Sequence, residues 1–282
     1  MNKILKFILT EILYNGHLQI FGSLCIAIFS AQLFKVKITW DFLLIIYLSL
    51  YLIYIYNRYR EMEIDYLTNK TRTEHLKKFD RHIPFIIFII ILSLIILLYF
   101  FSTFKFSIFL GAAIIMGLLY TDYFKGLTQK IFMFKNFYVA LTFAISIFFP
   151  FLYYNKPIYP VLAGVFGIAF FAFLRGIHMQ IILDLKDIEG DRRGGLLTLG
   201  ILYGEEKVIK ILKFSSIISA GIMPILIFLF LNITPAILIL LVLIFFDFYI
   251  ISLIKKEKFA AYILESGEFI LWPILIFIGK LL

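Results

Sequence analysis

Cysteine and charged residues are both scarce in this chain of 282 residues. The single cysteine, Cys25, excludes an intrachain disulfide. Only 16% of the residues are charged and 62% are hydrophobic, so a water-soluble globule of this composition could not cover its surface. The sequence also lacks strand-like alternation long enough to compete with helices, and it lacks low-complexity linkers. These absences predict an all-α integral membrane protein.

Long apolar runs fill most of the sequence instead. A bilayer core takes about 20 mostly apolar residues per helix. The candidate spans lie at about 13–34, 40–57, 83–103, 106–121, 137–154, 158–183, 214–231, 233–253 and 263–281. Nine transmembrane helices leave little room for a soluble region, so we expect a single membrane-embedded domain over residues 1–282.

The net charge of +9 is carried mainly by loops on one side of these spans. That side holds 21 of the 27 lysines and arginines, the other side holds five, and Arg175 lies within a span. By the positive-inside rule, the N-terminus and the basic loops face the cytoplasm. The basic balance therefore indicates topology in a cell membrane rather than nucleic acid binding, with a smaller role in attracting anionic lipids or substrates.

Two polar stretches interrupt the apolar pattern, each where a predicted span reaches the cytoplasmic side. The first reads YNRYREMEIDYLTNKTR and begins at Tyr56. If the helix of residues 40–57 continues through it, Asn57, Glu61 and Asp65 recur every four residues and point the same way. This spacing predicts a face that carries one amide and two carboxylates.

The second stretch, DLKDIEGDRRGG, carries three aspartates at the end of the span 158–183. Asp184, Asp187 and Asp191 share a face if the helix continues. Oxygen ligands without histidine or cysteine suit a hard cation such as Mg²⁺, which is usually bound jointly by a few carboxylates and substrate phosphates. We therefore interpret the two stretches as halves of one magnesium site.

Basic residues follow both sets of acids. Lys70 and Arg72 come after the first set, and Arg192 and Arg193 come after the second. Acids can then hold cations while the bases meet phosphate oxygens. The alternative for either stretch alone is a solvated turn at the membrane interface, but two such faces in one chain favour a site.

Together these stretches resemble the two aspartate-rich motifs of the UbiA superfamily of intramembrane prenyltransferases. The first family motif, Asn-Asp-x-x-Asp-x-x-x-Asp, is represented by Asn57, Glu61 and Asp65. Asn69 and Arg72 match the Asn-x-x-Arg that commonly follows it. The second motif, Asp-x-x-Asp-x-x-x-Asp, is complete. The resemblance covers nearly the whole chain, because the family has nine transmembrane helices.

A third segment, YTDYFK from Tyr120 to Lys125, resembles the family's Tyr-Ser-x-x-x-Lys, whose basic residue helps to hold diphosphate. Two positions depart from the family pattern. Arg58 stands where an aspartate usually follows the motif's asparagine, and Glu61 replaces the next aspartate. The usual Arg-Pro near the start of the first helix is also missing from EILYNGHLQIFG. These departures bear on acceptor specificity more than on the chemistry of the prenyl diphosphate.

The resemblance implies nine helices around a central cavity, with the two acidic faces opposed at its cytoplasmic mouth. It also implies a reaction in which a prenyl diphosphate ionises at C1 to an allylic cation and diphosphate. One Mg²⁺ is assigned to Asn57 and Glu61 and another to Asp187 and Asp191, with Asp65 and Asp184 either as additional ligands or as groups that support the ligands.

By the same resemblance, Arg72, Lys125 and Lys70 hold the diphosphate. Tyr120 is the aromatic residue that we expect to stabilise the allylic cation by cation–π attraction. The hydrocarbon tail of the donor would lie between the helices, among Phe, Tyr, Ile and Leu side chains. The expected partners are thus a prenyl diphosphate, an acceptor and membrane lipids.

Arg175 and His178 lie deeper in the span 158–183. An arginine within a span is costly unless it faces the protein interior or a water-filled cavity. We expect Arg175 either to contact the acceptor or to pair with an acid, and a buried structural pair with His178 is the simpler alternative.

The predicted function is transfer of a polyprenyl group from its diphosphate to a lipophilic or interfacial acceptor. Acceptors in this superfamily include aromatic acids or quinone precursors, glycerol-based lipid headgroups, haems or chlorins, and sugar phosphates. A related enzyme that cyclises or eliminates the same substrate without an acceptor is the main alternative. A transporter is a distant one, because its ionisable residues would lie near the midplane of several helices.

Overall fold

The computed structural model describes residues 3–63, 66, 70–229, 233–256 and 260–282, and among these it contains helices and no strand. The all-α prediction is thereby confirmed. The chain forms two compact units, which we call unit 1 (Met1–Leu24 with Thr39–Gly126) and unit 2 (Cys25–Ile38 with Leu127–Leu282). That residues 1–282 make a single domain stays a prediction.

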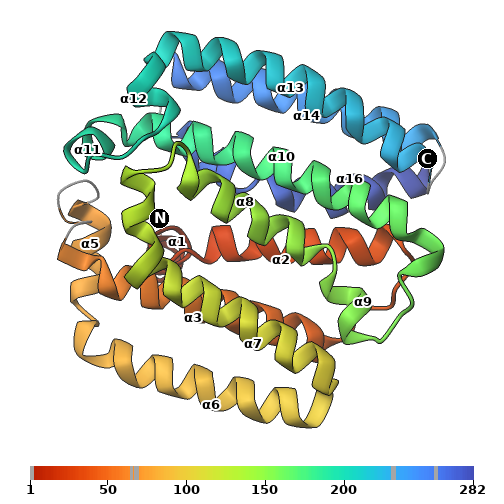
Figure 1. Ribbon diagram of the computed structural model, residues 1–282, viewed down its shortest axis with the longest axis horizontal. Helices are drawn as coiled ribbons and strands as arrows, with labels where there is room; N and C mark the ends of the chain where they lie inside the picture. The colour runs from red at the N-terminus through yellow and green to blue at the C-terminus, as the bar shows by residue number, and fades with distance from the viewer. Residues whose placement is uncertain (1–2, 64–65, 67–69, 230–232, 257–259) are drawn as a thin grey trace. The chain divides into compact units, whose positions relative to one another are not determined.

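Unit 1 is built on α3, which packs against α6 and α7 (Figure 1). Its helices are α1 (Lys3–Tyr14), the first part of α2 (His17–Leu33), α3 (Trp40–Arg60), α5 (Lys70–Lys77), α6 (Ile83–Phe101) and α7 (Phe104–Leu119). A π-helix, η2 (Tyr120–Phe124), and a 3₁₀ helix, η3 (Lys125–Gln129), follow α7. The hydroxyl of Tyr47 on α3 lies 2.7 Å from His17 Nδ1 on α2.

Unit 2 is built on α10, which packs against α8 and α13; α14 packs against both α13 and α16 (Figure 1). Its helices are the rest of α2, α8 (Phe134–Ser146), α9 (Phe149–Tyr153), α10 (Leu162–Lys186), α11 (Ile188–Arg193), α12 (Leu199–Tyr203), α13 (Glu205–Phe228), α14 (Ile233–Ile254), α15 (Ala260–Ser266) and α16 (Glu268–Leu281). Gly176 lets α8 and α10 approach closely, because a Cβ there would lie 2.9 Å from the Cα of Ala140. Small residues at such crossings favour helix packing in membranes.

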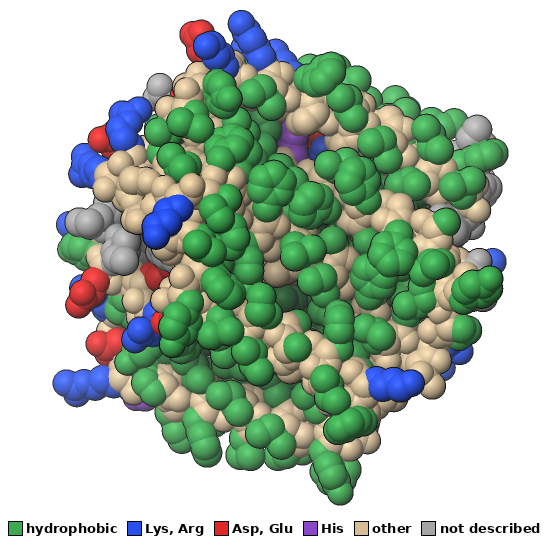
Figure 2. Space-filling model, in the orientation of Figure 1, with side chains coloured by type: hydrophobic (Ala, Val, Ile, Leu, Met, Phe, Trp, Pro, Cys, Tyr) green, Lys and Arg blue, Asp and Glu red, His purple; other side chains and the backbone are tan. Residues whose placement is uncertain are grey.

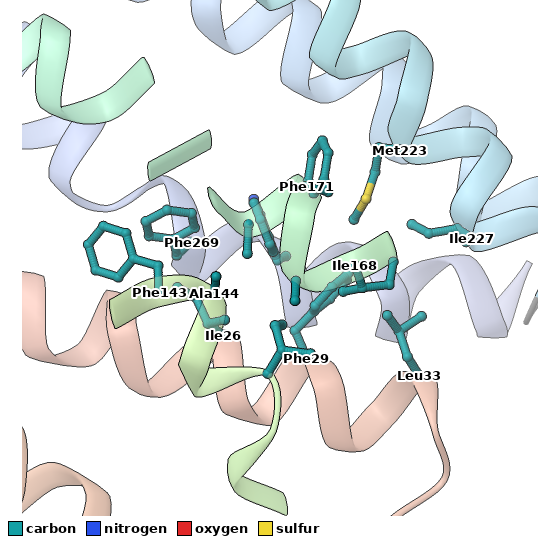
Figure 3. Packing of buried hydrophobic residues seen from close by; sticks show 14 of the residues in the cluster. Ile26, Phe29, Leu33, Phe143, Ala144, Ile168, Phe171, Met223, Ile227 and Phe269 are labelled. Carbon is teal, nitrogen blue, oxygen red and sulfur yellow. The ribbon is translucent and has the colours of Figure 1, made fainter. Parts of the chain in front are cut away.

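The interior of unit 2 is filled by large apolar side chains. Figure 3 shows Phe29 of α2, Phe171 of α10 and Phe269 of α16 within one buried cluster. The ring of Trp272 lies 5.0 Å from that of Phe29 and 5.1 Å from that of Phe171, between centroids. Such aromatic pairs add about 0.5–1.5 kcal/mol each beyond area burial.

Hydrophobic side chains also cover the outside of the protein. Figure 2 shows a face that is mostly hydrophobic, with charged side chains gathered along its left edge. In unit 1, Phe85, Ile95 and Phe100 of α6 are exposed. Apolar surface of this extent suits contact with lipid tails rather than water.

Among the described residues, six helices have the length and apolar composition needed to cross a bilayer, and a seventh span results if α15 and α16 count as one bent helix. The whole of α2 has only 17 residues, and the predicted span 137–154 is divided into α8 and α9. The count of nine transmembrane helices is therefore not confirmed and stays a prediction.

Two predicted spans are broken for identifiable reasons. Pro150 lies in the first turn of α9, and its ring would clash with the carbonyl of Ser146 in a continuous helix, which is where α8 ends. The span 263–281 is bent by 54° between α15 and α16, on either side of Gly267. Hydropathy alone does not locate such breaks, because the residues on both sides are equally apolar.

Candidate functional site

The C-terminal end of α3 carries the first polar motif, next to the π-helix η2. Asn57 Oδ1 accepts a hydrogen bond from Thr121 Oγ1 at 3.1 Å. The hydroxyl of Tyr56 donates to Asp122 Oδ2 at 2.5 Å, and Arg60 Nε donates to Asp122 Oδ1 at 3.0 Å. We call these five residues the α3–η2 cluster.

The local backbone explains why these side chains meet. A π-helical turn takes up an additional residue and re-aims the side chains that follow, and such turns are frequent at functional sites. Here η2 begins at Tyr120, which is half-buried, and ends just before Lys125, the first residue of η3. The segment singled out in the sequence thus packs beside the first motif through Thr121 and Asp122.

Glu61 lies one turn beyond Asn57, but α3 ends at Arg60, so the continuous helix considered from the sequence is interrupted here. Glu61 is the C-cap, and its backbone N–H donates to the carbonyl of Asn57 at 3.0 Å. The chain loses its apolar side chains at this point, and with them the packing that stabilises most helices. Asp65 and Asn69 lie outside the described residues.

Arg58, which replaces a family aspartate, is directed back along α3. Its Nη2 donates to the hydroxyl of Tyr54 at 2.9 Å, and the guanidinium carbon lies 4.8 Å from the centroid of the Tyr54 ring. Tyr54 in turn fills the space beside Gly16, where a Cβ would lie 2.0 Å from Tyr54 Cε1.

Two of the basic residues expected to hold diphosphate, Lys70 and Arg72, lie on α5 and differ in exposure. Lys70 is exposed, and its Nζ lies 3.9 Å from Glu74 Oε1. Arg72 is half-buried. Helix α5 is held against α1 by His75, whose Nε2 lies 2.7 Å from Glu11 Oε1.

The second motif begins with a buried carboxylate. Asp184 is 3% exposed, and both of its oxygens accept hydrogen bonds from α8. Lys135 Nζ donates to Oδ1 at 2.8 Å, and Asn136 Nδ2 donates to Oδ2 at 2.7 Å. Asp184 therefore joins α10 to α8.

The other two aspartates follow a break in the helix. Asp187 is both the C-cap of α10 and the N-cap of α11, and its side chain is 28% exposed. Its carbonyl accepts a hydrogen bond from the N–H of Asp191 at 2.8 Å, so Asp187 and Asp191 are still one helical turn apart after the break. Asp191 is buried, at 7% exposed. Lys186 Nζ lies 3.6 Å from Asp187 Oδ2.

The loop after α11 is fixed against the segment before α8. The N–H of Leu197 donates to the carbonyl of Thr128 at 3.1 Å, and the N–H of Met133 donates to the carbonyl of Leu197 at 2.9 Å. This pairing holds the end of the second motif beside the start of the helix that binds Asp184.

Each unit thus gathers its own predicted residues. Unit 1 brings Asn57 and Glu61 next to the segment of Tyr120, and unit 2 brings Asp184, Asp187 and Asp191 together. Sequence reasoning missed the partners of these acids. Asp122 could have been noticed inside YTDYFK, whereas Lys135 and Asn136 carry no motif and lie 48 or more residues from Asp184.

Arg175 lies in the interior of unit 2 and pairs with two acids, which is one of the roles expected from the sequence. It is 0% exposed and forms paired hydrogen bonds with Asp247 of α14 and Glu268 of α16, at 2.7–2.8 Å. The alternative of a structural pair between Arg175 and His178 is not what the described residues show, because His178 Nδ1 lies 2.8 Å from Ser215 Oγ. The two acids could not be assigned from sequence, because they lie 72 and 93 residues from Arg175.

Comparison with known proteins gives the family. The UbiA prenyltransferase family matches residues 19–266. A stretch of 61 residues is 39% identical to the digeranylgeranylglyceryl phosphate synthase of Methanosphaera stadtmanae, covering 22% of this chain and 22% of that protein. The chain thus matches about a fifth of the length of this curated relative.

Solved structures show the same fold. A UbiA homologue from Aeropyrum pernix K1 has a TM-score of 0.70 at 13% identity, covering 93% of this chain and 96% of the other. A UbiA homologue from Archaeoglobus fulgidus, bound to GPP and Mg²⁺, has a TM-score of 0.66 at 14% identity, covering 97% and 99%. The helical fold is UbiA-like, and the family match extends over most of the chain. This protein therefore belongs to the UbiA prenyltransferase family.

Proposed function

We propose that this enzyme transfers a polyprenyl group from a prenyl diphosphate to a lipophilic or interfacial acceptor, at the cytoplasmic side of a cell membrane that it crosses nine times. The complete second motif carries this proposal. Its first acid, Asp184, is bound by Lys135 and Asn136, and Asp187 and Asp191 follow at the next turn. A fixed first acid holds the two following carboxylates at the end of α10.

The donor atoms of both motifs fit Mg²⁺. They are carboxylate and amide oxygens, the ligands that a hard cation prefers. Asn57 Oδ1 takes one hydrogen bond from Thr121, and an amide oxygen has a second lone pair to offer. We assign one ion to Asn57 and Glu61 and one to Asp187 and Asp191, with Asp65 and Asp184 in supporting roles. Bound Mg²⁺ supplies positive charge beside the leaving diphosphate.

The basic residues complete the neutralisation of that anion. Lys70 and Arg72 of α5 and Lys125 of η3 donate to diphosphate oxygens in this proposal. Cleavage of the C1–O bond leaves the electron pair on diphosphate and an allylic cation on the prenyl chain. Tyr120 stabilises this cation through its ring face. The acceptor then attacks C1 and loses a proton.

A glyceryl phosphate lipid is the first acceptor to test. The 39% identical stretch belongs to a relative named digeranylgeranylglyceryl phosphate synthase. Aromatic quinone precursors come next. The family pattern near the first helix, where Gly16 and His17 lie, is altered in this chain and bears on acceptor specificity, so more than one class of acceptor is tested.

The test is diphosphate release by the purified full chain in nanodiscs. Geranyl, farnesyl and geranylgeranyl diphosphates are supplied with Mg²⁺ or EDTA, with and without a pool of acceptors. Release that needs both Mg²⁺ and an acceptor supports the proposal, and mass spectrometry of the adduct identifies the acceptor. Release without any acceptor would instead indicate a cyclase or lyase and overturn the transferase proposal.

Variants on one helix provide the matched control. Asp187→Ala and Asp191→Ala should abolish release. Glu189→Ala removes a carboxylate from the same short helix, but its side chain is 63% exposed and pairs only with Arg192 and Arg193 among the described residues. It should leave the rate unchanged. Full activity in either aspartate variant would remove the metal assignment.

A further inference from the structure

A second group of acids lies inside unit 2, outside both aspartate motifs. It consists of Asp247 of α14, Glu265 of α15 and Glu268 of α16, arranged around Arg175 of α10. All four side chains are 0% exposed. We call these residues the Arg175 cluster. Its position within apolar helices makes every unbalanced charge costly.

Arg175 is fully used by its partners. Nε donates to Glu268 Oε1 at 2.8 Å, and Nη2 donates to Glu268 Oε2 and to Asp247 Oδ1, both at 2.7 Å. Nη1 donates to Asp247 Oδ2 at 2.7 Å and to Ser219 Oγ at 3.1 Å. A guanidinium has five N–H donors. It therefore has none left for Glu265.

Glu265 is the exception in the cluster. Neither of its carboxylate oxygens has a hydrogen-bond partner among the described residues, although both are buried. One oxygen each from Asp247, Glu265 and Glu268 nevertheless lie within 4.8 Å of one another. Glu265 is thus directed at two other carboxylates with no donor between them.

The formal charges of the cluster do not balance. Three carboxylates face one guanidinium, which leaves an excess of two negative charges. His178 is the other titratable group at the cluster, with Nε2 at 3.9 Å from Asp247 Oδ2, and it could offset one charge at most. Burying two uncompensated charges costs several kcal/mol per ion. Either a cation beside Glu265 or a proton on it must offset this charge.

The geometry suits a metal ion. Three oxygens no more than 4.8 Å apart share a point within about 2.8 Å of each, close to the ~2.3–2.6 Å that Ca²⁺ takes in its flexible coordination. Mg²⁺ demands shorter distances and a nearly ideal octahedron. Glu265 and Glu268 also flank the bend at Gly267. Helices broken within a membrane supply ion ligands in this way.

We propose that Asp247, Glu265 and Glu268 bind a divalent hard cation of the size of Ca²⁺, which ties α14, α15 and α16 together. A divalent ion balances the two excess charges, whereas Arg175 holds the other sides of Asp247 and Glu268. This ion is separate from any that acts on diphosphate, because no residue of the Arg175 cluster belongs to either aspartate motif.

The experiment uses the full chain in nanodiscs, in an Asp187→Ala/Asp191→Ala background that removes the second motif's ligands. After desalting, metal content is measured by mass spectrometry, and thermal unfolding is followed with added Ca²⁺ or Mg²⁺. We expect about one equivalent of divalent ion and a Tm that rises with Ca²⁺. Adding Glu265→Gln should abolish both, and adding Glu189→Gln, an exposed carboxylate of α11, should abolish neither.

Infrared spectroscopy keeps the proposal testable if Glu265→Gln does not fold. A bound cation keeps Glu265 ionised, so the otherwise native chain should show no acid carbonyl band from the cluster while Ca²⁺ is bound. A band that appears when Ca²⁺ is removed should disappear when Ca²⁺ is added back. Absence of bound metal together with a Tm indifferent to Ca²⁺ would overturn the proposal. So would an acid carbonyl band that persists at neutral pH in saturating Ca²⁺, because a buried acid of the cluster would then carry a proton instead of binding the cation.

Discussion

Lys135 of α8 and Asp184 of α10 form an ion pair, with Nζ 2.8 Å from Oδ1. Asn136 binds the other oxygen of the same carboxylate. The first acid of the second motif thus joins two helices, whereas Asp187 and Asp191 follow it across the break between α10 and α11. The motif is thus divided in the fold into one buried link, Asp184, and two acids at the helix end, the two to which the ion is assigned from the sequence.

Loss of this ion pair should destabilise the fold. Lys135→Met leaves a buried carboxylate with only Asn136, and because Lys135 is 32% exposed we expect about 1–2 kcal/mol rather than the ~3–5 kcal/mol typical of a fully buried pair. Thermal unfolding in detergent measures the loss. Lys130→Met, at an exposed position, is the control. A native Tm in Lys135→Met would show that the pair contributes nothing.

Neutralising an acid of the second motif should change the metal dependence. Asp187→Asn keeps the shape of the side chain but removes its charge, so the Mg²⁺ concentration that gives half-maximal diphosphate release should rise at least about tenfold, as expected when about 1.4 kcal/mol of binding is lost. Titration of the rate with Mg²⁺ provides the comparison. An unchanged titration curve would show that Asp187 is not a ligand of Mg²⁺.

Thr121 should act through Asn57. Thr121→Val removes the hydroxyl that donates to Asn57 Oδ1 and frees the amide to rotate. Groups that orient a metal ligand contribute about 10- to 100-fold to metal affinity or activity. We expect a loss of that size in the Mg²⁺ titration. Thr142→Val, which removes a hydroxyl bonded only to a carbonyl of its own helix, should have no effect.

Restoring the family residue at position 58 should be tolerated. Arg58 is held by Tyr54 at 2.9 Å, one turn before the polar end of α3. Arg58→Asp should therefore change diphosphate release by less than about fivefold, the equivalent of ~1 kcal/mol for a partly exposed charge. A much larger loss in the steady-state rate would show that this chain uses the arginine for its substrate.

Gly16 should be intolerant of any side chain. Its φ of +76° is unfavourable for other residues, and a Cβ would lie 2.0 Å from the Tyr54 ring. Gly16→Ala should lower stability by at least about 1–2 kcal/mol from the backbone alone. Gly111→Ala in α7 is the matched control, since nothing lies within 4 Å of its Cβ and helix propensity favours alanine. Equal Tm values for the two variants would contradict this account.

Much of the candidate site could be predicted because its motifs are local. Asn57 and Glu61 are one turn apart, as are Asp187 and Asp191, and helical periodicity relates each pair without any tertiary information. The boundaries were less predictable: α3 ends at Arg60, and α8 ends where Pro150 forbids its continuation. These ends depend on capping and on single residues, to which an average of hydropathy is insensitive.

The sequence by itself determined the solvent, the helical class and the positions of the acids, because composition and periodicity are properties of neighbouring residues. Only the tertiary structure decided which acids are bound by basic side chains. Lys135 meets Asp184 over 49 residues, and Arg175 meets Asp247 and Glu268 over 72 and 93. Charges buried in apolar surroundings must find partners wherever the packing of helices brings them, and no local pattern in the chain records that choice.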